Sequence, residues 1–92
     1  MYHVRLMGFH ELETRSFFSI GALATDCEHT DAIEFAEICA RQLEDVAWVL
    51  CRAHDCNGIT VDVYDEHGDV VLSWELIPGR PLVLYTGDEC HE

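Results

Sequence analysis

Apolar and polar residues alternate along three stretches of the chain, as they do in half-buried strands. Residues Tyr2–Met7 alternate in this way, and Gly8 ends the run. Ile59–Tyr64 and Val70–Leu76 alternate as well, and the residues between them, Asp65–Gly68, are typical of a tight turn. These last two stretches predict a β-hairpin, the strongest hairpin signal in the chain.

Two further stretches are predicted to be extended. Thr14–Leu23 carries apolar bulk, including two adjacent phenylalanines, and Pro81–Tyr85 predicts a last strand at a sheet edge because proline cannot donate a ladder hydrogen bond. In the hairpin, Asp62 and Glu75 occupy the positions opposite the core-facing valines and leucines. We therefore expect both carboxylates to point to solvent.

One long helix is predicted from about Asp31 to Arg52 or Ala53. Asp31 or Thr30 can cap its start, with Glu34 completing a capping box. Apolar residues recur there at steps of three and four, which predicts a single stripe toward the core. The stripe consists of Phe35, Cys39, Leu43, Val46 and Leu50, flanked by Ala32, Ala36 and Ala47.

The expected fold is α+β, with an antiparallel sheet of about four to five strands and one long helix packed on one face. The element order is β-β-α-β-β-β, because short hairpin connections imply antiparallel pairing. The 92 residues predict a single domain, 1–92.

Charge is the outstanding feature of the composition. Eighteen Asp and Glu stand against five Arg and no Lys, for a formal net charge of −13. Direct binding to nucleic acid or to an anionic membrane is disfavoured, because both need Lys and Arg. The odd number of cysteines, five, favours a reducing, cytoplasmic location. A halophilic source would also produce such acidity, and the sequence leaves that alternative open.

A metal site is the first chemistry to consider. Cys51, His54 and Cys56 place three zinc-type ligands within six residues, with Cys27, His29, Cys90 and His91 elsewhere. The spacing is not that of a paired Cys-x-x-Cys site, and the alternative is that Cys51 packs in the helix. Cys56 beside His54 lacks an activating environment, because surrounding carboxylates raise a thiol pKa. Neither an enzyme nor a cofactor is predicted.

The helix face opposite the apolar stripe favours protein binding. It combines carboxylates with a tryptophan, Trp48, which is a typical interface anchor; the alternative is that a strand or loop folds over this side chain. The acidic residues of the hairpin extend the negative surface, and complementary charge of this kind attracts a basic partner. The predicted partner-binding residues are Glu34, Glu37, Glu44, Asp45, Trp48, Asp62, Asp65, Glu66 and Asp69.

In size, acidity and sheet-plus-helix plan the whole chain resembles phage-encoded inhibitors that mimic nucleic acid, anti-CRISPR proteins above all. The resemblance implies a stoichiometric inhibitor that occupies the basic nucleic-acid-binding groove of a CRISPR effector or a similar enzyme. The segment Ile59–Trp74 with the preceding helix is also similar to small bacterial domains of unknown function. The alternatives are an assembly subunit that forms a homodimer through an open sheet edge or the aromatic patch, and a small metal-binding domain.

Overall fold

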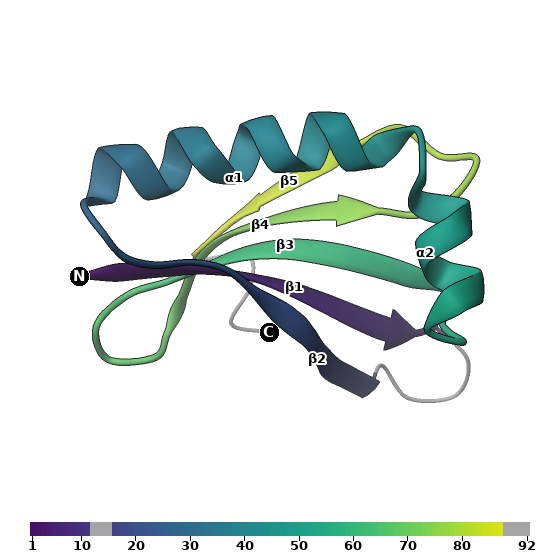
Figure 1. Cartoon of the computed structure of the whole chain (residues 1–92), viewed down its shortest axis with the longest axis horizontal. Helices are drawn as coiled ribbons and strands as arrows, with labels where there is room; N and C mark the ends of the chain where they lie inside the picture. Colours follow the sequence, from purple (N-terminus) through teal and green to yellow (C-terminus); the bar gives the residue numbers. More distant parts are fainter. Residues whose placement is uncertain (12–15, 88–92) are drawn as a thin grey trace.

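A computed structural model describes residues 1–11 and 16–87. Five strands form a single antiparallel sheet in the order β2-β1-β3-β4-β5, with α1 along one face and α2 at its end (Figure 1). The elements are β1 (Tyr2–His10), β2 (Ser16–Cys27), α1 (His29–Glu44), α2 (Ala47–Ala53), β3 (Gly58–Tyr64), β4 (Val70–Leu76) and β5 (Val83–Thr86). The α+β class and the antiparallel sheet are thus confirmed.

The prediction of one long helix is wrong, and the element order is β-β-α-α-β-β-β. Helix α1 ends at Glu44, and Val46 leaves helical geometry with φ −115° and ψ 11°. The Val46 N–H then bonds the Leu43 carbonyl at 3.1 Å, the tighter bonding pattern of a helix terminus. The helical spacing of apolar residues continues across this break, and no glycine or proline marks it, so the sequence predicts one continuous helix.

The start of α1 also differs from the prediction. The helix begins at His29, and the N-cap residue is Glu28, whose side chain makes no capping hydrogen bond. Asp31 lies in the first turn instead of at the cap. In this position its carboxylate interacts favourably with the positive end of the helix dipole.

The face that α1 turns to the sheet is lined by small residues. Ala32, Ala36 and Ala40 are fully buried, whereas Phe35, predicted to lie in the core stripe, is exposed. Val46, predicted in the same stripe, is also exposed. Most of the bulky core side chains belong to the sheet. Because they fill the space between the sheet and α1, the helix can pack closely on the sheet only where its own side chains are small. These sheet residues include Val4, Leu6, Ile59, Val61, Val63, Trp74 and Leu76.

Strand β1 does not end at Gly8 but continues to His10. A Cβ at Gly8 would lie 2.5 Å from the ring of Phe18 on β2, so the strand passes beneath that ring only because residue 8 has no side chain. Strand β2 is longer than predicted and contains three register shifts against β1. The predicted start of this strand, Thr14, lies outside the described residues.

The hairpin prediction is confirmed. Strands β3 and β4 pair antiparallel, with Val61 opposite Trp74. Gly68 adopts φ 83° in the connecting turn, the left-handed conformation expected of glycine there. Strand β5 closes the sheet at the edge next to β4, as its proline-preceded sequence predicts.

Candidate functional site

The outer surface of α1 carries the predicted acidic residues. Glu34, Ile38, Arg41 and Asp45 follow one another at steps of four, three and four, opposite the buried alanines, and all four are exposed. Glu37 lies beside this ridge and accepts a hydrogen bond from Arg41 Nε at 3.2 Å. The helix thus presents carboxylates and one large apolar side chain to solvent on the same surface.

Trp48 extends this surface onto α2. Trp48 is 56% exposed, so of the two alternatives it is the uncovered one that the structure has, and the Arg52 guanidinium lies 5.5 Å from the ring centroid. A cation at this distance from an indole face restrains the ring by a cation–π interaction. Val49 on the same short helix is also exposed. We use the name helical surface for a set of exposed residues on α1, its C-cap and α2. The set comprises Glu34, Glu37, Ile38, Arg41, Glu44, Asp45, Trp48 and Val49.

The helical surface has four carboxylates and one arginine, a formal charge of −3, and the helix segment that carries it is more negative still. Between Glu28 and Asp45 the chain has six carboxylates and one arginine, a formal charge of −5 over this segment. All six of these carboxylate residues are exposed. Exposed like charges at this density create a field that attracts a basic surface and is screened by salt.

The acidic residues of the β3–β4 turn do not join this surface. Figure 1 shows the turn between β3 and β4 at one end of the sheet and α2 at the other. Asp65 has a structural role, because its Oδ1 accepts the backbone N–H groups of His67 and Asp69, each at 2.9 Å. These bonds hold the Asp65 pKa below its ordinary value. Glu66 and Asp69 are exposed, and Glu66 lies 3.7 Å from the amino group of Met1.

The prediction that Asp62 and Glu75 point to solvent is wrong. Asp62 is 6% exposed and Glu75 is 8% exposed, on the face of the sheet away from the helices. Asp62 Oδ1 accepts the Ser73 hydroxyl at 2.6 Å, and its Oδ2 accepts the Tyr64 hydroxyl at 3.2 Å. Burial raises the Asp62 pKa, and these two hydrogen bonds oppose the rise. Asp62 therefore organises a buried polar cluster and is not available to a protein partner.

Sequence reasoning missed this cluster because alternation alone does not distinguish a solvated face from a buried polar one. A signal was present in the residue types: Thr60 and Asp62 on β3 pair with Glu75 and Ser73 on β4, and Tyr64 follows Asp62 by two residues on the same strand. Hydroxyl groups directly beside carboxylates are the partners that buried carboxylates require.

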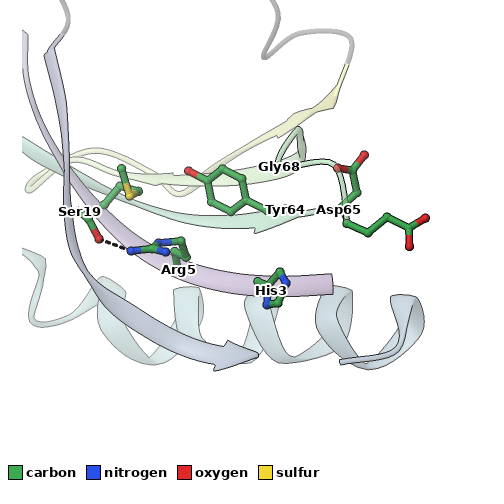
Figure 2. Close-up of a pocket in the computed structure, with 8 residues that line it drawn as sticks. His3, Arg5, Ser19, Tyr64, Asp65 and Gly68 are labelled. Atoms are coloured by element: carbon green, nitrogen blue, oxygen red, sulfur yellow. Dashed lines mark hydrogen bonds between the residues drawn. The ribbon is translucent and has the colours of Figure 1, made fainter. Parts of the chain in front are cut away.

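A hollow of about 440 Å³ lies on the same face of the sheet, between β1, β2 and the β3–β4 turn. Figure 2 shows Arg5 reaching toward Ser19, and the Arg5 Nη2 donates to Ser19 Oγ at 2.8 Å. Tyr64 lies at the side of the hollow nearest the turn. Burial, together with the neighbouring Asp62 carboxylate, raises the pKa of Tyr64 to about 12. The phenol therefore remains a neutral hydrogen-bond donor at physiological pH.

The three candidate metal ligands do not form a site. Cys51 is buried in α2, His54 is exposed, and Cys56 is half-buried. Burial raises the pKa of the Cys51 thiol to about 12, with a contribution from Cys56, which opposes the formation of a nucleophilic thiolate. Within residues 1–11 and 16–87, no three His, Cys, Asp or Glu side chains are grouped to hold a metal ion. Cys90 and His91 lie outside the described residues.

Among the helices of the described residues, none is long and apolar enough to cross a membrane. No family model, curated protein or solved structure matches this chain.

Proposed function

We propose that this protein is a non-catalytic, acidic inhibitor that binds a basic protein surface through its helical surface. In this proposal it acts in the cytoplasm, which is that of the host cell if a phage encodes it. There it competes with nucleic acid for the basic groove of a nucleic-acid-binding protein, such as a CRISPR effector. The partner-binding residues are Glu34, Glu37, Glu44, Asp45 and Trp48. Asp62 is excluded from this set because it is buried, and the turn residues Asp65, Glu66 and Asp69 are at most a secondary contact.

The observation that carries this proposal is the exposed Trp48 beside a segment of charge −5. A large aromatic side chain held by Arg52 offers contact area at little cost in side-chain entropy, as interface anchors do. The surrounding carboxylates supply long-range attraction and orientation. The partner therefore has an apolar pocket for the indole, surrounded by Lys and Arg.

The test is affinity capture with the tagged protein, followed by competition against nucleic acid. We expect a captured nucleic-acid-binding protein that dissociates as salt rises, because the interaction is between charges. Adding the wild-type protein should displace a labelled oligonucleotide from that partner at a one-to-one ratio. Glu44→Lys with Asp45→Lys should prevent capture, and Trp48→Ala should weaken it by at least about tenfold, the loss expected for an interface anchor.

The matched control reverses the same number of charges at the other end of the molecule. Glu66→Lys with Asp69→Lys changes the net charge by the same amount as the helical double variant, but on the β3–β4 turn. It should retain capture and competition. If both double variants lose binding equally, net charge and not the helical surface is responsible, and the assignment of the site is wrong.

A homodimer joined through β2 is the second candidate, and one observation favours it. Strand β2 is an edge strand of 12 residues whose single formally charged residue is Asp26. Long uncharged edges pair readily with another strand. Sedimentation at low and high salt tests this candidate: a dimer should persist at high salt, and Ala22→Lys on the exposed part of β2 should dissociate it. A monomer at both salt concentrations would exclude this alternative.

A further inference from the structure

The hollow on the sheet face away from the helices contains a cation whose hydrogen-bonding capacity is largely unused. Arg5 is exposed and donates a hydrogen bond to the Ser19 hydroxyl, a neutral group. Among the described residues no carboxylate lies within ion-pair distance of its guanidinium, whereas Arg41 and Arg80 pair with Glu37 and Glu11. A guanidinium has five N–H donors arranged as a planar fork, so several remain for a ligand.

Further donors line the same hollow. His3 Nδ1 accepts the Asp26 backbone N–H at 3.4 Å, so in the neutral ring the proton is on Nε2, which is then a donor. The Ser19 hydroxyl accepts from Arg5 and keeps its own proton to donate. Together with Arg5 they form a set of donors around one fixed positive charge, which is suited to an oxyanion.

Two carboxylates, Asp65 and Glu66, line the hollow, and both already have partners. Asp65 accepts two backbone N–H groups of its own turn, and Glu66 lies 3.7 Å from the Met1 ammonium. Asp62 accepts hydrogen bonds from the hydroxyl groups of Ser73 and Tyr64. A cationic ligand would have to displace these partners, whereas an anionic ligand meets the free donors of Arg5 directly.

We propose that this hollow binds a small organic carboxylate, with its carboxylate on the Arg5 guanidinium and its apolar body against Met7 and the Tyr64 ring. The volume of about 440 Å³ is in the range of small-molecule sites. A singly charged anion is favoured over a phosphate dianion, because one guanidinium must offset the repulsion of a protein with net charge −13. This ligand site is independent of the proposed helical surface.

The test is a titration of the isotope-labelled, full-length protein with benzoate, followed by NMR of the backbone amides. Benzamide, which has the same shape without the charge, is the matched ligand control. We expect saturable shifts at residues 3–7 and at Ser19 with benzoate, and much weaker binding of benzamide. This comparison needs no substitution and therefore does not depend on the folding of a variant.

Two variants then locate the charge that matters. Arg5→Met keeps an apolar stem and removes the guanidinium, and should weaken benzoate binding by about tenfold to a hundredfold, the value of a charge-assisted hydrogen bond. Arg80→Met removes the same charge from the β4–β5 connection and should leave the affinity unchanged. Absence of saturable shifts, equal binding of benzamide, or an Arg5→Met affinity equal to that of the wild type would each overturn the proposal.

Discussion

We expect the hydrogen bond from Ser73 to Asp62 to contribute measurably to the free energy of unfolding. Its 2.6 Å length and the burial of both side chains place it among charge-assisted hydrogen bonds. Ser73→Ala leaves a buried carboxylate with one hydroxyl partner fewer, and should reduce the free energy of unfolding by about 1.5–3 kcal/mol at neutral pH. In a domain of this size the loss corresponds to a melting temperature lower by roughly 10 °C.

The assay is urea unfolding of the wild type, Ser73→Ala, Asp62→Asn and the double variant. The cost of Ser73→Ala should fall to about 0.5–1.5 kcal/mol in the Asp62→Asn background, because only a neutral acceptor remains. Ser19→Ala is the matched control: the same atom is removed from an exposed hydrogen bond on the same face, and the change should stay within about 0.5 kcal/mol. Equal costs for Ser73→Ala in both backgrounds, or a cost no larger than that of Ser19→Ala, would refute the assignment.

Four further outcomes are expected. Burial raises the pKa of Asp62, so its protonated form favours the folded state. The stability that this group contributes is therefore complete below its ordinary pKa of 3.8 and is lost as pH rises through its pKa in the folded state. Asp62→Asn should flatten this part of the curve of unfolding free energy against pH, measured by urea unfolding. The Tyr64 phenol should ionise at about 12 in an ultraviolet titration, and its contribution to stability should decline between its ordinary pKa of 10 and that value. Gly58→Ala would place a Cβ 2.4 Å from the Phe9 ring and should destabilise the fold by about 1–3 kcal/mol in urea, whereas an unchanged midpoint would show that the ring moves freely. Trp48→Ala should change the free energy of unfolding in urea by no more than about 0.5 kcal/mol, so a loss of partner binding by this variant would not result from a loss of folding.

The elements that depend on local pattern could be predicted from the sequence. Alternation over Ile59–Tyr64 and Val70–Leu76, with a glycine in the turn, specifies the hairpin without knowledge of the rest of the chain. Helical spacing also placed Trp48 among charged residues, although it left open whether another segment covers the ring; the structure shows it exposed. In these places local preference and tertiary packing agree.

The features set by packing between elements could not be predicted. Whether Ala36 or Phe35 faces the sheet depends on how much space Trp74 and Leu76 leave, and the sequence of the helix does not contain that information. The break between α1 and α2 allows Ala47 and Cys51 to reach the core after the chain changes direction. Asp62 finds a hydrogen-bond partner on β4 because Ser73 lies opposite it in the sheet, which is a consequence of register.

The positions of the two tryptophans give the molecule two separate optical reporters. Trp74 is buried under α1, with the Arg41 guanidinium 5.7 Å from its ring, whereas Trp48 is mostly exposed on α2. Acrylamide, which is uncharged, should quench the fluorescence of Trp48 and spare Trp74, and iodide should quench Trp48 less well because the acidic surface repels it. A Trp48→Phe protein would then report only on the core, and a Trp74→Phe protein only on the helical surface, so docking and unfolding could be followed separately in the same chain.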